Sequence, residues 1–98
     1  MINTVFSPQQ IKFEFLSYIK EFDLDPAAWR IGVAQDARTA LFVDNGVDEA
    51  RDIWLWKPAL SGAAARIVLT FFTDRFGVPA ATHVPGRETN CVFLFRKM

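Results

Sequence analysis

Few side chains in this 98-residue chain could carry covalent or metal chemistry, since it has one histidine and one cysteine. A hydrolytic triad needs a base beside its nucleophile. His83 lies in a stretch rich in proline and glycine, with no serine or cysteine nearby. One histidine and one cysteine also fall short of the three or four ligands of a usual zinc site. We therefore predict no triad, no zinc site and no resident cofactor.

A lone glycine and a pair of tryptophans are the candidate binding residues, and each also has a purely structural interpretation. Gly32 follows a predicted strand and precedes a capped helix, where exposed N–H groups could hold an anion. We favour the simpler interpretation, a glycine needed for a turn or for close packing. Trp54 and Trp56 are two residues apart and therefore share one face of a strand. Core packing is the favoured role of these rings, and an open face that stacks a base or docks a partner is the alternative.

Composition limits the possible partners. The 11 basic and 11 acidic residues leave no net charge that would attract nucleic acid or an anionic membrane. The one electrostatic bias is a mildly basic stretch over residues 66–98. A hydrophobic content of 51%, with ten phenylalanines and three tryptophans, predicts a folded core. The length predicts a single domain over residues 1–98.

The cysteine and the apolar segments indicate the compartment. Cys91 has no second cysteine to pair with, and its position in the apolar run 91–95 predicts a buried small side chain. The N-terminal segment lacks a basic region followed by an apolar stretch, so a signal peptide is not indicated. No segment approaches the roughly 20 apolar residues of a membrane span. We expect a cytoplasmic protein without a membrane segment.

Capping signals and apolar periodicity predict three helices. Ser7, Asp36 and Ser61 are suitable caps, and Gly77 is a suitable helix end. The segment 11–15 also alternates like a strand, but the cap and the longer period favour a helix. The predicted helices are 8–22, 37–43 and 62–76, and the predicted strands are 29–33, 53–57 and 89–95. This order predicts an α+β fold, with a three-stranded sheet packed by three helices.

Several short segments between residues 29 and 95 share the order and spacing of a known family. They are Trp29-Arg30-Ile31-Gly32-Val33-Ala34-Gln35-Asp36, Asp44-Asn45-Gly46-Val47, Asp52-Ile53-Trp54, Ala64-Ala65-Arg66-Ile67-Val68 and Val92-Phe93-Leu94-Phe95. In this respect the chain resembles small stand-alone relatives of the GIY-YIG nuclease superfamily. The resemblance implies phosphodiester hydrolysis, in which a glutamate holds a divalent cation, an arginine steadies the phosphate and tyrosines position water.

The side chains at the matching positions depart from that chemistry. The glutamate position is Val68, and the strand tyrosine position is Trp29. The arginine is either Arg38, about two positions early, or is lost as Ala40. The resemblance therefore implies a non-catalytic relative.

Three functional hypotheses follow. The first is a binding or interaction module that uses the face around Trp29, Gly32 and Arg38. The second is a divergent nuclease that holds Mg²⁺ or Mn²⁺ through Asp36 or Asp52. The third is a structural subunit that dimerises through its aromatic strand, which carries Trp54 and Trp56. The ligand and the partner stay open, with a protein or a second copy of the chain as candidates and nucleic acid not favoured by the net charge.

Overall fold

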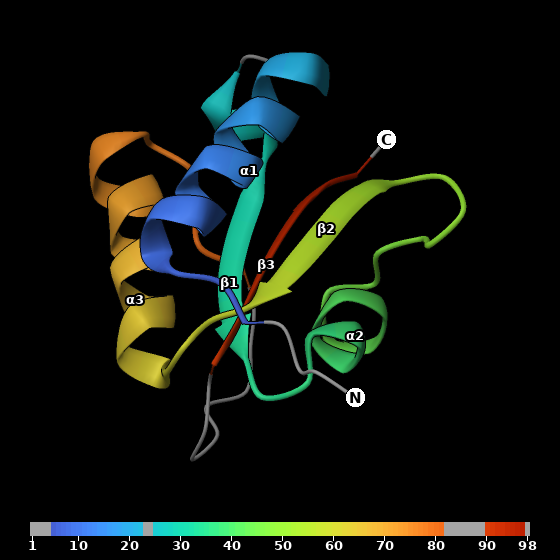
Figure 1. Cartoon of the computed structure of the whole chain (residues 1–98). Helices are drawn as coiled ribbons and strands as arrows, with labels where there is room; N and C mark the ends of the chain where they lie inside the picture. The colour runs from blue at the N-terminus through green and yellow to red at the C-terminus, as the bar shows by residue number, and fades with distance from the viewer. Residues whose placement is uncertain (1–4, 23–24, 82–89, 98) are drawn as a thin grey trace.

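The computed structural model describes residues 5–22, 25–81 and 90–97, and the statements below refer to these residues. The main elements are α1 (Pro8–Phe22), β1 (Arg30–Ala34), α2 (Ala37–Thr39), β2 (Ile53–Pro58), α3 (Gly62–Thr70) and β3 (Cys91–Arg96). Figure 1 shows this α-β-α-β-α-β order, which confirms the predicted α+β fold with a three-stranded sheet. None of the described helices is long and apolar enough to cross a membrane.

The sheet is antiparallel, with β3 in its centre and the order β1-β3-β2. Residues paired across neighbouring strands point to the same face. One face therefore carries two rows of three residues, Arg30–Phe95–Trp54 and Gly32–Phe93–Trp56. The opposite face carries the row Ile31–Leu94–Leu55. The pairing register thus determines which side chains can meet.

Helices cover both faces of the sheet. In Figure 1, α1 and α3 pack on one face, and α2 lies on the other, beside β2. The first core includes Phe15 and Phe72 of the helices with Val92 and Leu94 of β3, and the second includes Leu41 with Phe93 and Phe95. All residues of Cys91–Phe95 are buried because β3 is both central and covered on two sides. Burial also raises the pKa of the Cys91 thiol, consistent with the predicted core residue.

The predicted helix caps are confirmed by hydrogen bonds. Ser7 and Gln10 form a reciprocal pair, in which the Ser7 backbone N–H donates to Gln10 Oε1 at 2.9 Å and the Gln10 N–H donates to Ser7 Oγ at 3.2 Å. Ser61 Oγ accepts from the Ala64 N–H at 3.1 Å. Gly77 has a φ of 76°, the left-handed conformation that ends a helix without a side-chain clash.

The helix ends and the chain before β1 differ from the prediction. α2 continues as a wider π-helical turn, η2 (Ala40–Asp44), and α3 continues as η3 (Phe71–Arg75). A short 3₁₀ turn, η1 (Pro26–Ala28), stands where only a chain break was predicted. The Trp29 N–H closes this turn on the Pro26 carbonyl at 3.1 Å, so β1 begins at Arg30 instead of Trp29.

The other two strands also shift slightly. β2 extends through Pro58, at which the strand was predicted to stop, and β3 covers 91–96 where 89–95 was predicted. Most of the predicted loop 78–88 lies outside the described residues, except for residues 78–81.

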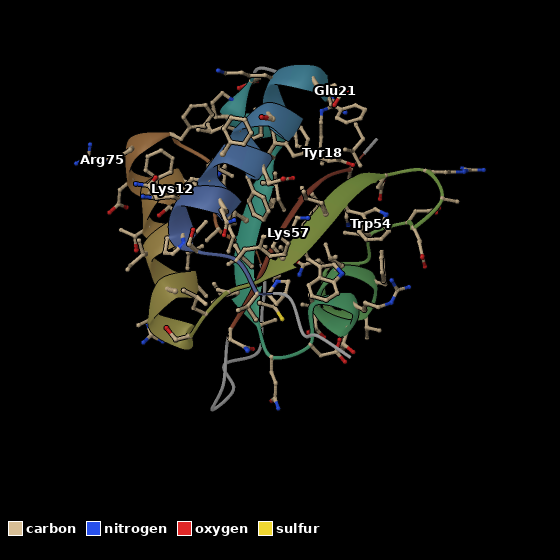
Figure 2. The ribbon with its side chains drawn as sticks, viewed as in Figure 1. Lys12, Tyr18, Glu21, Trp54, Lys57 and Arg75 are labelled. Atoms are coloured by element: carbon tan, nitrogen blue, oxygen red, sulfur yellow. The ribbon has the colours of Figure 1, made fainter. Side chains whose placement is uncertain are left out.

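Both outer strands have short partners along their free edges. On the β1 side, the Ile31 N–H donates to Pro79 O at 3.1 Å, and the Ala81 N–H donates to Ile31 O at 2.8 Å. On the β2 side, the Phe6 N–H donates to Pro58 O at 2.9 Å. The Tyr18 hydroxyl of α1 donates to the carbonyl of Trp54 at 3.1 Å; both residues are labelled in Figure 2.

Candidate ligand-binding site

The five residues predicted to bind a ligand do not all lie on one face. Gly32, Trp54 and Trp56 point toward α2, which itself carries Arg38. Trp29 instead lies in the core between the sheet, α1 and α3, with no exposed surface. Its ring packs edge-on against Tyr18, with 6.1 Å between centroids. Trp29 is therefore a core side chain of this structure, and the expected face is built without it.

Gly32 serves close packing in the middle of β1. Its strand position pairs with Phe93, whose ring lies directly over it. A Cβ atom added to Gly32 would lie 2.4 Å from Phe93 Cζ, a separation too short for two carbon atoms. Gly32 lies inside the strand instead of at its end, so the structure matches the close-packing interpretation of this glycine and not the anion-holding turn.

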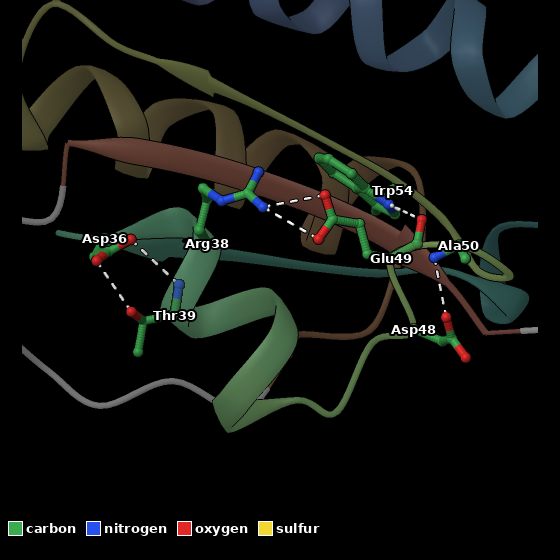
Figure 3. A network of polar contacts seen from close by, with 7 residues as sticks. All are labelled: Asp36, Arg38, Thr39, Asp48, Glu49, Ala50 and Trp54. Carbon is green, nitrogen blue, oxygen red and sulfur yellow. Dashed lines mark hydrogen bonds and ion pairs between the residues drawn. The ribbon is translucent and has the colours of Figure 1, made fainter.

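Arg38 and Trp54 come together around Glu49 (Figure 3). Arg38 Nη2 lies 3.2 Å and 3.1 Å from the two carboxylate oxygens of Glu49. The guanidinium also lies 5.0 Å from the ring centre of Phe42 and 6.0 Å from that of Trp54. Trp54 Nε1–H donates to the Glu49 carbonyl at 3.1 Å, and Phe42 meets the Trp54 ring edge-to-face. The arginine expected to steady a phosphate is thus paired and stacked within the protein.

The contacts around Arg38 hold the loop that joins η2 to β2 against the sheet. The side chains of Arg38 and Glu49 are 54% and 57% exposed. Exposed ion pairs of this kind contribute about 0–1 kcal/mol. The partly buried Trp54 ring, in contact with Phe42, contributes more to the order of this loop than the ion pair does.

The acidic residues considered as alternative metal ligands are engaged in local turns. Asp36 accepts hydrogen bonds from the Thr39 N–H at 3.2 Å and from the Thr39 hydroxyl at 3.0 Å, and the backbone hydrogen bond is the main cause that lowers the pKa of Asp36. Asp52 Oδ2 accepts from the Asp48 N–H at 2.8 Å. Each carboxylate therefore already stabilises a turn, one at the start of α2 and one before β2.

Val68, which was predicted to match the family's glutamate, lies on the other side of the sheet from this network. Val68 is fully buried in the core of α1 and α3, whereas Arg38 lies on the other side of the sheet. The sheet thus separates the two positions that a metal-dependent site of that type would bring together. In the described ranges, no three His, Cys, Asp or Glu side chains are grouped so that they could hold a metal ion.

A pocket that the sequence did not predict lies at one end of the sheet, on the face that carries Arg30 and Phe95. Its volume is about 560 Å³, within the usual range for small-ligand sites. Separate parts of the chain form its walls: Ala27, Ala28 and Arg30, together with residues 44–45, 80–81 and 95–97. The basic bias of the last third of the sequence was the only signal, because these segments meet only through the tertiary fold.

Arg30, Lys97 and Asp44 are the charged residues that shape this pocket on the α2 side. Arg30 Nη1 donates to the carbonyls of Ala27 at 2.9 Å and Trp29 at 2.8 Å, which orients the guanidinium. Lys97 lies just beyond the end of β3, and its Nζ lies 3.5 Å from the position that a Cβ atom on Gly46 would take. Asp44 contributes the acidic side chain. The pocket therefore combines oriented positive charge with the apolar surface of Phe95 and nearby alanines.

The comparisons with known proteins add no constraint. Neither protein-family models, nor curated proteins, nor solved structures give a match to this chain. The assignment of a function consequently depends on the residues and geometry described above.

Proposed function

We propose that this domain is a non-catalytic binding module that holds a small ligand in the pocket at the end of the sheet. The observation that carries the proposal is the pocket itself, an open hollow of about 560 Å³ lined by four separate segments of the chain. Its walls bring several charged and polar groups together with alanine side chains and Phe95, and convergent polar groups of this kind can fix the orientation of a ligand. The hydrogen bonds of Arg30 to two carbonyls keep one of those groups in place without a ligand.

We also propose a degenerate GIY-YIG-like scaffold for the module. The α-β-α-β-α-β order supports this relationship. The loss of catalysis is supported by the buried position of Val68 and by the engagement of Arg38 with Glu49. A single cysteine in the whole sequence supports a reducing compartment such as the cytoplasm.

The ligand proposal predicts localised changes in an NMR screen of small fragments against the ¹⁵N-labelled protein. Hits should shift the amides of Ala28, Ala81 and Phe95, which line the pocket, more than the amides of the Arg38–Trp54 contact. The matched control is the groove between α1 and α3 that is lined by Lys12 and Phe71. A screen in which hits gather at that groove, or in which none reaches the pocket, would contradict the proposal.

The non-catalytic proposal predicts no metal-dependent cleavage of DNA or RNA. An enzyme must lower the barrier to phosphodiester hydrolysis by very roughly 15–20 kcal/mol, and metal charge is central to that effect. The assay incubates plasmid and labelled RNA with high protein concentrations and Mn²⁺. Asp36→Asn and Asp52→Asn serve as variants that remove a charge while keeping a hydrogen-bonding side chain. Nicking by the natural sequence that either variant abolishes would establish the divergent nuclease in place of a binding module.

A further inference from the structure

We infer that the ligand of the pocket carries a carboxylate or phosphate group on a small apolar body. This inference rests on the proposed function and adds the chemical class of the ligand. It depends on Arg30, Lys97 and the apolar surface around Phe95, none of which the sequence patterns singled out as a binding site.

Arg30 is oriented as an anion receptor. A guanidinium has five N–H donors. The two hydrogen bonds to the Ala27 and Trp29 carbonyls both use Nη1. The tether therefore does not involve the donors on Nε and Nη2. The residue is exposed at the pocket wall. Its planar fork matches the geometry of a carboxylate or a phosphate, and a tethered fork loses little freedom when it binds.

Lys97 supplies a second positive charge on the same side of the sheet. Antiparallel pairing places Arg30 opposite Phe95, and Lys97, just beyond the end of β3, lines the same pocket with its Nζ near Gly46. Arg96 also borders the pocket, but its position pairs with Ile53 and directs its side chain to the opposite face. We therefore assign the binding of the anion to Arg30 and Lys97 alone.

The remaining walls favour a small ligand with a single anionic group over a polyanion. Asp44 opposes part of the positive charge, and the whole chain is neutral, so no extended field attracts a polyanion. Phe95 and Ala81, which are 4% and 8% exposed, add a small apolar part to the wall beside Ala27 and Ala28. An anionic group beside Arg30 and Lys97, with an apolar group against Phe95, satisfies both parts of the pocket.

The test compares probes that share a ring and differ in charge. Benzoate, phenyl phosphate, benzamide and benzylamine are titrated into the ¹⁵N-labelled protein, and the amides of Ala28, Ala81 and Phe95 are followed. Benzoate or phenyl phosphate should bind at least about fivefold more tightly than benzamide, because a hydrogen bond between two charged groups is stronger than one to a neutral amide, although solvent reduces the difference at an open site. The relative affinities of the first two probes distinguish a carboxylate from a phosphate ligand.

Substitutions at the pocket provide the second readout. Arg30→Gln and Lys97→Gln should each weaken benzoate binding by about threefold to tenfold, while Asp44→Asn should strengthen it. Arg66→Gln, which removes an exposed arginine on α3, is the matched control and should leave the affinity unchanged. The NMR spectrum of each variant shows whether it is folded. If Arg30→Gln disturbs η1, Lys97→Gln still tests the inference, because Lys97 is an exposed residue beyond β3.

Two negative results have different meanings. Equal or tighter binding of benzamide or benzylamine in the pocket would overturn the anion assignment and leave the binding module intact. If none of the four probes binds, and the fragment screen also finds no hit in the pocket, both the anion assignment and the proposed function fail.

Discussion

Replacing Phe72 with alanine is expected to lower the free energy of unfolding by about 3–5 kcal/mol. Phe72 has no exposed surface and lies at the centre of an aromatic cluster. Its ring centre is 5.9 Å from that of Phe15, 5.1 Å from Phe71 and 5.9 Å from Phe76. Truncation removes the ring contacts between α1 and η3 and leaves a cavity that this small core can fill only in part.

Urea unfolding followed by circular dichroism measures this loss, with Phe13→Ala as the matched control. Phe13 lies on α1 as well but is 71% exposed, so its truncation should change stability by no more than about 0.5 kcal/mol. Similar midpoints for the two variants would show that the aromatic cluster is not the main support of the domain.

Gly32→Ala is expected to destabilise the domain by about 1–3 kcal/mol, although alanine is the better residue for most backbone positions. The added methyl group would lie 2.4 Å and 2.8 Å from Phe93 Cζ and Cε1. Phe93 is fully buried in the central strand, so its ring cannot swing into solvent. Either the ring leaves its preferred position, or β1 and β3 shift against each other.

A double-mutant cycle with Phe93→Leu separates this clash from a general intolerance of side chains at position 32. The smaller leucine leaves room for the methyl group, so Gly32→Ala should cost less in the Phe93→Leu background, with a coupling energy of about 1 kcal/mol. Chemical denaturation of the four proteins gives the coupling. Additive losses would mean that a backbone requirement of Gly32, and not the ring above it, sets the cost.

The parts of the fold that were predictable depend on neighbours in the sequence. Ser7 with Gln10 and Ser61 with Ala64 interact across three residues, so the pattern of residue types contains the whole interaction. The helical spacing of the apolar residues in α1, and the central place of Phe72 in its apolar stripe, also depend on residues that are close in the sequence. For this reason the order of the elements and the main core follow from the order of the amino acids alone.

The candidate site was less predictable because most of it depends on tertiary contacts. Trp29 and Gly32 were expected near one site, but strand alternation already places residues three apart on opposite faces. In β1 the odd-numbered residues face α1 and α3, and the even-numbered ones face α2. The contact of Arg38 with Glu49 joins residues 11 apart through a loop whose path the sequence did not indicate. The pocket required the β1-β3-β2 order, which brings Arg30 next to Phe95 and Lys97 although they are more than 60 positions apart in sequence.

The partners along the two outer strands have a consequence for self-association. An uncovered sheet edge offers backbone groups to any other chain and invites aggregation or exchange of strands. Here Phe6 and the Tyr18 hydroxyl occupy carbonyls of β2, and residues 79–81 bind Ile31 of β1. Addition of a strand at Ile31, Trp54 or Pro58 would have to displace these groups first. This cost opposes dimers that form by strand addition at those positions.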